Sequence, residues 1–309
     1  MNAHAGSLLA TLTTGLENYQ QAVGQLPGVQ TPVHRDVFLY QLIDSIRRVA
    51  FAKVIATRSI SPKRADGLSD LFDPLRAAIW RATRKEHDEA CWLTFLFVHF
   101  GRHPVSGYRY TREVYSALGQ RAPWTFKEVT KEPDILRAWL DANKDHLSRG
   151  SNRGFGNHRK YLSLSGAGHA GTGDAFVSYV EWVNAHGDHQ QLFNEGLNAS
   201  GGNPEGAFEW LYKSMIAVSS FGRTGRFDYL TMIHKLNLAT LRPGRPYFDS
   251  TTSGPNKGAQ AMFGGMYSIK ELESLTVGLG NYLGVGMQEM EDALCNWGKD
   301  PGTYHYFRG

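Results

Sequence analysis

The sequence predicts an all-α protein. Apolar residues recur at spacings of three and four along several long stretches, which is the pattern of helices that bury one face. No stretch alternates apolar and polar residues for long enough to predict a strand. With 309 residues, of which 41% are apolar and 20% charged, the chain can bury a substantial core as one two-lobed domain or two small ones.

The first half of the chain is expected to form a helical lobe. After a weak helical pattern in the first thirty residues, helices are expected over residues 36–58, 69–85, 86–100, 111–118 and 133–147. The most apolar run, residues 91–100, has half the length needed to span a bilayer and is therefore expected to be a core helix. The N-terminus lacks the pattern of a secretory signal, and a cytoplasmic location is expected. Cys91 and Cys295 lack the spacing of a zinc site or a disulfide framework.

A basic, glycine-rich segment divides the chain. Residues 146–173 contain no acidic residue. Their basic and aromatic residues include Arg149, Arg153, Arg159, Lys160, Phe155 and Tyr161. Such a segment can follow a sugar-phosphate backbone and stack on a base, or it can be a connector with solvated charges, and both interpretations stay open. We therefore expect an N-terminal helical lobe over residues 1–147 and a motif-bearing lobe over residues 148–309.

Three helices are expected after this segment, over residues 174–184, 190–198 and 204–218. The buried face of the third is expected to comprise Phe208, Leu211, Tyr212, Met215 and Ile216. Between the first two helices, His186 and His189 flank Asp188, a pattern that can bind a metal but is more typical of a polar loop. No metal site is expected there.

The segment FGRTGRFDYL follows at residues 221–230. Arg223 and Arg226 precede a helix that is expected to begin near Phe227, with Asp228 in its first turn, where the helix dipole stabilises a carboxylate. Asp228 is then either a helix-start acid paired with a neighbouring arginine or a carboxylate that stabilises positive charge developing on a sugar.

The segment TTSGPNKGAQAMFGG, at residues 251–265, predicts a turn that ends in a helix N-terminus. Ser253 can cap the helix, Gly254 allows a positive φ, and Pro255 suits the first turn. The unpaired N–H groups of such an end, together with Lys257, would bind a phosphate. The alternative is an ordinary corner between two helices.

The last helix is expected over residues 286–299. Its buried stripe comprises Met287, Met290, Leu294 and Trp297, and its second face Asp292, Asn296 and Lys299. Glu291 lies at the edge of the apolar stripe, where partial burial would suit acid–base catalysis, although the spacing by itself favours a surface acid.

Four segments carry a resemblance to a known family: FGNHRKY at residues 155–161, GRFDYL at 225–230, SGPNKGA at 253–259 and EDALCNWGK at 291–299. Together they resemble the α-glutamyl/putrescinyl thymine pyrophosphorylase family, clade 3, over residues 154–299. The resemblance implies a place in the helix–hairpin–helix DNA glycosylase superfamily, a two-lobed helical fold with a DNA-binding cleft, and action on hypermodified pyrimidines. Members are associated with phage DNA hypermodification, and relatives in phage-defence loci excise glucosylated hydroxymethylcytosine.

The hairpin departs from the glycosylase pattern L-P-G-V-G. TTSGPNK keeps only the glycine and Lys257, which falls where bifunctional glycosylases carry a Schiff-base lysine. The catalytic aspartate expected farther along is missing, because that position is Leu275. The nearest carboxylates are Glu271 and Glu273, and the neighbours of Glu273 predict an exposed helical face. The catalytic carboxylate is therefore to be chosen from Asp228, Glu291 and Glu273, and the first two are favoured.

The residue patterns and the resemblance together define the expected site. The catalytic carboxylates are Asp228 and Glu291. DNA is expected to contact Arg153, His158, Arg159, Lys160, Arg223, Arg226, Ser253, Gly254 and Lys257. The base pocket is expected to comprise Phe155, Tyr161, Asn296 and Lys299. No metal or organic cofactor is required, and the expected partner of the monomer is double-stranded DNA with modified pyrimidines, not a membrane.

The favoured function is excision of a bulky modified pyrimidine after it is flipped out of the duplex. A second hypothesis is a transferase that replaces pyrophosphate on an activated hydroxymethylpyrimidine with an amine or amino acid. A third is a non-catalytic reader of modified DNA.

Overall fold

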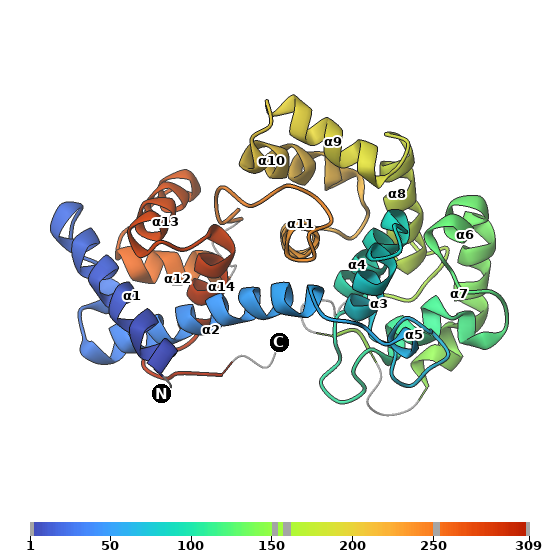
Figure 1. Ribbon diagram of the computed structural model, residues 1–309, viewed down its shortest axis with the longest axis horizontal. Coiled ribbons are helices and arrows are strands. Elements are labelled where there is room, and N and C mark those ends of the chain that lie inside the picture. Colours follow the sequence, from blue (N-terminus) through green and yellow to red (C-terminus); the bar gives the residue numbers. More distant parts are fainter. Residues whose placement is uncertain (1–2, 150–153, 157–161, 250–253, 307–309) are drawn as a thin grey trace. The chain divides into compact units, whose positions relative to one another are not determined.

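The computed structural model describes residues 3–149, 154–156, 162–249 and 254–306. All regular structure in these ranges is helical, apart from one isolated antiparallel bridge between His103 and Gly107 (Figure 1). The expected all-α class is therefore confirmed. None of the helices in these ranges combines the length and the apolar character that crossing a bilayer requires.

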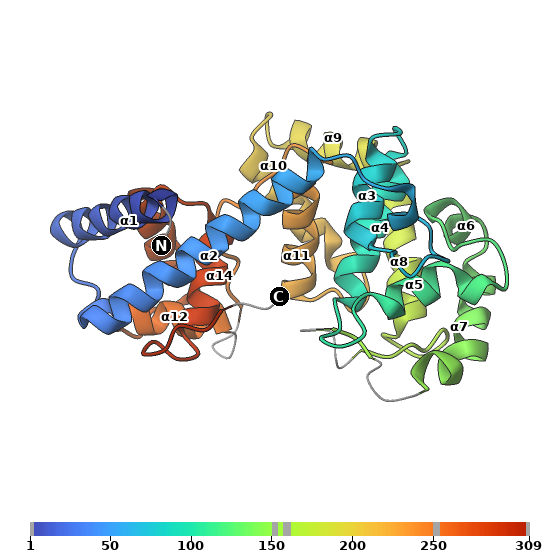
Figure 2. The ribbon, with the colours of Figure 1, turned by 60° about the horizontal axis from the view of Figure 1, so that its bottom comes forward.

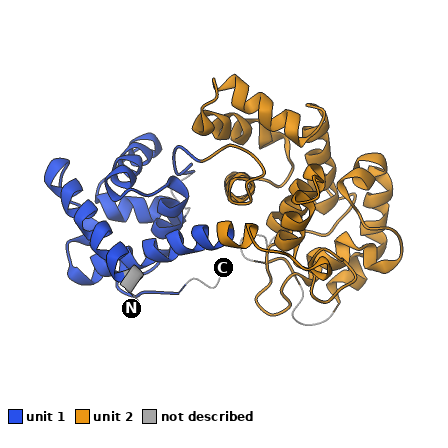
Figure 3. Cartoon of the chain, viewed as in Figure 1, with its two compact units in different colours: residues 1–52, 243–308 blue, residues 53–242, 309 orange. Residues whose placement is uncertain are grey.

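The chain divides into two compact units (Figure 3). Unit 1 combines residues 1–52 with residues 243–308, and unit 2 comprises residues 53–242 with residue 309. The expected boundary between residues 147 and 148 therefore lies inside unit 2. Unit 1 therefore joins two segments that are about 190 residues apart along the chain, residues 1–52 and 243–308, and no local composition signal could indicate this.

Unit 1 contains α1 (Ala3–Ala22), most of α2 (Pro32–Ala56), α12 (Gly254–Phe263), α13 (Ile269–Leu283) and α14 (Met287–Trp297). Its core joins apolar residues from both chain segments, such as Leu12 and Leu42 with Met262 and Leu294. A Cβ at Gly15 would lie 2.6 Å from the carbonyl oxygen of Tyr282, so glycine allows α1 to approach α13.

Unit 2 contains nine α-helices in its described residues. They are α3 (Pro74–Ala82), α4 (His87–Phe100), α5 (Arg109–Tyr115), α6 (Phe126–Lys131), α7 (Pro133–Ser148), α8 (Thr172–Asn184), α9 (His189–Ala199), α10 (Pro204–Ser214) and α11 (Arg223–Lys235). Helix α4 is the apolar run predicted to be a core helix, and it packs against α3, α5, α6, α9 and α11 (Figure 2). The ring of Phe95, on α4, stacks on the ring of Tyr179 of α8, with 3.9 Å between the two ring centroids.

Several helix ends differ from the prediction for local reasons. Helix α3 begins at Pro74 and not at residue 69, because the Asp73 carboxylate accepts hydrogen bonds from the backbone N–H groups of Leu75 and Arg76. Helix α10 ends at Ser214 and is followed by a short 3₁₀ turn. Ile216 in that turn is 75% exposed, so the prediction that it shares the buried face is wrong.

Candidate functional site

In unit 1, two of the family-like segments form helices that lie against each other. A Cβ at Gly258 of α12 would lie 2.1 Å from the carbonyl oxygen of Leu294 on α14. A Cβ at Gly298 would lie 2.6 Å from the Cα of Gly258. Only glycine fits at these two positions, so the sequence pair GPNKG and CNWGK encodes a close helix contact.

The first turn of α12 lies beside Cys295. A Cβ at Gly254 would lie 2.7 Å from the Cys295 sulfur. The expectation of a positive φ at Gly254 is wrong, because this residue belongs to α12 and its φ is outside the left-handed region. Glycine is required there by the approach of Cys295. Lys257, in the same turn, is exposed and has no ion-pair partner among the described residues.

Glu291 lies on α14 four residues before Cys295, a rise of about 6 Å along the axis. It is only 8% exposed, so the interpretation as a surface acid, which the spacing by itself favoured, is wrong. Asn296 follows on the same helix, which ends at Trp297 and not at residue 299 as expected. Lys299 lies in the turn after the helix, and its ammonium donates a 3.0 Å hydrogen bond to the Asn296 side-chain oxygen. Unit 1 therefore packs α14, which carries Glu291 and Asn296, against α12, whose first residue lies beside Cys295.

Asn256 is a buried polar residue that the sequence analysis missed. It is fully buried, and its Nδ2 donates to the carbonyl oxygen of Asp249 at 2.9 Å. Neither its Oδ1 nor the Oδ1 of Asp249 has a hydrogen-bond partner in the part of the chain that the structure describes. Because unpaired buried acceptors are costly, these oxygens require a donor from a water or a bound molecule.

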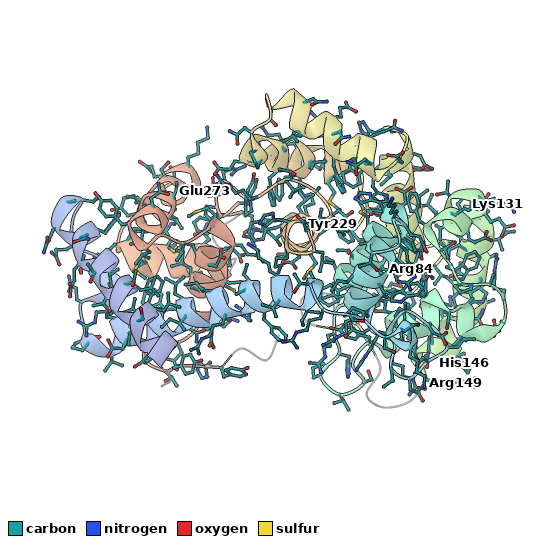
Figure 4. All side chains as sticks on the ribbon, viewed as in Figure 1. Arg84, Lys131, His146, Arg149, Tyr229 and Glu273 are labelled. Carbon is teal, nitrogen blue, oxygen red and sulfur yellow. The ribbon has the colours of Figure 1, made fainter. Side chains whose placement is uncertain are left out.

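Glu273 corrects the prediction of an exposed helical face. It is 6% exposed and lies on α13 (Figure 4). Its carboxylate accepts hydrogen bonds at 2.8 and 2.6 Å from Nη1 of Arg245 and at 2.8 Å from the backbone N–H of Phe248. Glu273 therefore anchors the irregular segment before α12, and its contacts are those of a structural residue.

In unit 2, the GRFDYL segment lies within α11. This helix begins at Arg223, so Asp228 is its sixth residue and the prediction that it occupies the first turn is wrong. Asp228 is partly exposed. Arg226 donates through Nη1 to the carbonyl oxygen of Tyr212 at 3.1 Å and lies 4.3 Å from that ring's centroid. Arg223 lies 5.1 Å from the centroid of the Phe227 ring.

Tyr229 of the same segment, labelled in Figure 4, belongs to a buried chain of hydrogen bonds. Its hydroxyl lies 2.7 Å from that of Tyr179, which lies 2.6 Å from Nε2 of His189. His189 Nδ1 lies 2.6 Å from the Asp88 carboxylate. Burial lowers the pKa of His189, whereas the hydrogen bond from His189 lowers that of Asp88. Both shifts fit a neutral imidazole that donates to an ionised Asp88 and accepts from Tyr179.

His186, Asp188 and His189 each contact a different partner and do not form a common site. His186 lies 2.6 Å from the Glu195 carboxylate, and Asp188 caps α9 through the N–H of Gln191. His189 contacts Asp88, 101 positions away along the chain. The described residues contain no group of three or more His, Cys, Asp and Glu side chains placed to hold a metal ion.

The basic segment is described only in part. Phe155 is partly buried, and its ring lies 5.5 Å from that of Phe100 and 5.6 Å from that of His99. The adjacent Gly156 donates to the carbonyl oxygen of Phe100 at 2.7 Å. The expected site residues outside the described ranges are Arg153, His158, Arg159, Lys160, Tyr161 and Ser253.

The expected catalytic residues lie in different units, Asp228 in unit 2 and Glu291 in unit 1. Residues 33–309 match a family model described as alpha-glutamyl/putrescinyl thymine pyrophosphorylase clade 3. That description implies an enzyme that acts on modified bases of DNA. Comparisons with curated proteins and with solved structures gave no match. Because the matched residues include both units and all four family-like segments, the chain belongs to the alpha-glutamyl/putrescinyl thymine pyrophosphorylase clade 3 family.

Proposed function

We propose that the protein is a DNA glycosylase that excises a bulky hypermodified pyrimidine, such as glucosylated hydroxymethylcytosine, from phage DNA in anti-phage defence. Its substrate is double-stranded DNA, and a monomer suffices for the reaction. The target base must leave the stack, because its N-glycosidic bond cannot be reached inside the duplex. Water then adds to C1′ of the sugar as the C1′–N bond breaks, which yields a free base and an abasic site.

The observation that carries this proposal is the burial of Glu291 on α14, the helix whose Cys295 lies beside the start of α12. A carboxylate in such a place can stabilise positive charge on the sugar and orient the attacking water, as carboxylates do in other sugar hydrolysis. In this scheme Lys257 and the first N–H groups of α12 bind a backbone phosphate. Asn296 and Lys299 face the base.

Asp228 is proposed as a second carboxylate that acts on the same reaction. Its α11 segment is one of the four family-like segments, and its side chain is partly exposed. Replacement of Asp228 by Asn should then lower base release without loss of folding. A role only in folding would change the unfolding midpoint and leave the rate per folded molecule unchanged.

The family description supports the transferase hypothesis as well, because a pyrophosphorylase makes or breaks a bond to pyrophosphate. In that reaction an amine or amino acid displaces pyrophosphate from an activated hydroxymethylpyrimidine. The DNA keeps its glycosidic bonds, and the mass of the base changes. The two reactions therefore differ in their products.

The test is incubation with phage DNAs that carry glucosylated hydroxymethylcytosine, other modified pyrimidines or unmodified bases. Mass spectrometry measures the released base, and alkali treatment reveals abasic sites. Release of the modified base together with alkali-labile sites supports the glycosylase. New base adducts on an intact backbone, formed only with an added amine, identify the transferase instead.

A matched pair of variants separates catalysis from recognition. Glu291→Gln removes the charge of the buried carboxylate, and Glu17→Gln makes the same change at an exposed carboxylate of unit 1. We expect Glu291→Gln to reduce base release by at least about 10²-fold while DNA affinity stays near wild type. If the two variants release base at equal rates, Glu291 has no catalytic role. A reader would bind modified DNA and release no base with any variant.

A further inference from the structure

A cavity of about 700 Å³ lies in unit 2, between the end of α3, the first turn of α4 and helix α6. Its volume is in the range of sites that hold small molecules. The cavity is lined by four basic side chains, Arg81, Lys85, Lys127 and Lys131, of which Lys131 on α6 is labelled in Figure 4. Phe126 adds an apolar wall.

The carboxylates around this cavity are all engaged by donors of the protein. Glu86 accepts from Arg81 Nη1 at 2.5 Å, so these two charges offset each other. Asp88 binds His189, as described above. Glu89 is buried and accepts from the Tyr115 hydroxyl at 2.6 Å and from a backbone N–H at 2.8 Å. Within the described residues, none of the three carboxylates forms an ion pair with a lysine of the cavity.

The three lysines have no such partners. Lys85, Lys127 and Lys131 are exposed, and none forms an ion pair with a carboxylate of the described residues. The cavity therefore holds ammonium groups that are not neutralised in place. An unneutralised group of this kind attracts an anion, and a phosphoryl group accepts from several ammonium donors at once.

Lys85 gives an independent reason to look for a ligand. It has a φ of 62° and ends α3 in a left-handed conformation. The Lys85 N–H donates to the Ala82 carbonyl oxygen and the Glu86 N–H to that of Arg81, which are the two bonds of a Schellman cap. Glycine is the favoured residue at this position, because a Cβ is strained there. A lysine at this position therefore makes the folded protein less stable than a glycine would, but it places a basic side chain in the wall of the cavity.

We propose that this cavity binds a small phosphorylated anion, held by Lys85, Lys127 and Lys131. The chemistry required is that of a phosphate or diphosphate group. The volume and the wall formed by Phe126 suit a small molecule, and a DNA backbone phosphate is the competing source of the same group. This inference concerns unit 2 alone and does not depend on the glycosylase proposal.

The experiment is a calorimetric titration of the full-length protein with inorganic pyrophosphate at constant ionic strength. Lys85→Gly, Lys127→Ala and Lys131→Ala should each raise Kd about two- to fivefold, as expected for the loss of one solvent-exposed charge contact. The triple variant should raise it at least roughly tenfold. Lys63→Ala, a change at an exposed lysine of unit 2 outside the cavity, should leave Kd unchanged.

Lys85→Gly provides the decisive reading, because it should weaken binding and raise the melting temperature together. A variant that only disturbed folding would lower both the affinity for pyrophosphate and the melting temperature. The proposal is overturned if pyrophosphate does not bind, or if Lys63→Ala weakens binding as much as the cavity variants. It is also overturned if the three substitutions weaken the binding of a duplex oligonucleotide but leave the binding of pyrophosphate unchanged.

Discussion

Removal of the Glu273 carboxylate should destabilise unit 1 and release the segment before α12. In Glu273→Ala the buried N–H of Phe248 loses its only acceptor of the described residues, which costs about 1–3 kcal/mol. Loss of the ion pair adds at most about 1 kcal/mol, because Arg245 is 37% exposed and can be hydrated. The free energy of unfolding should therefore fall by roughly 1–4 kcal/mol.

Two measurements test this prediction. Urea unfolding followed by circular dichroism gives the change in stability, and hydrogen exchange of the Phe248 amide reports the local contact. A loss of about 2 kcal/mol accelerates exchange through local opening by roughly thirtyfold. Glu273→Gln keeps one side-chain oxygen as an acceptor for Phe248 and should cost about 1 kcal/mol.

The control is Glu271→Ala, which removes an exposed carboxylate from the same helix. Glu271 forms a capping box with Ser268, so its loss should cost about 1 kcal/mol without changing the exchange of Phe248. If Glu273→Ala stays within about 0.5 kcal/mol of wild type and Phe248 exchanges at the same rate, the anchoring role is refuted. If the variant folds like wild type but releases no base, Glu273 is catalytic and our choice of Glu291 fails.

Three further predictions follow from the described contacts. Lys257→Ala should weaken DNA binding similarly for all sequences and reduce the salt dependence by about one phosphate contact, measured by titration at several salt concentrations. Borohydride should trap no adduct between wild-type protein and DNA; an adduct that disappears in Lys257→Ala would show a Schiff-base lysine instead. Stability should fall as the pH drops below the ordinary pKa of histidine, 6.5, because the lowered pKa of His189 means that the unfolded state binds more protons. Protonation of Asp88, whose folded pKa is also lowered, should add a further loss below pH 3.8. Thermal melts across this range should give a flatter profile for His189→Gln, and an unchanged profile would contradict the assignment.

The sequence by itself determined the helical class, the family and the buried side of the last helix. These properties depend on neighbours three and four positions apart, so local spacing encodes them. The last helix illustrates this, because the spacing of its apolar residues predicted the buried face, and Met287, Met290, Leu294 and Trp297 are all buried. The burial of Glu291 beside them was not predicted, because the same spacing favoured a surface acid.

Only the tertiary structure decided which polar residues have distant partners. Glu273 looked exposed from its helix neighbours, and its burial depends on Arg245 and Phe248 in a segment without regular structure. His189 is buried through Asp88, 101 positions away. The union of both chain ends in unit 1 is likewise a long-range packing result. Contacts of this kind depend on how the chain folds back on itself, and helical periodicity carries no information about them.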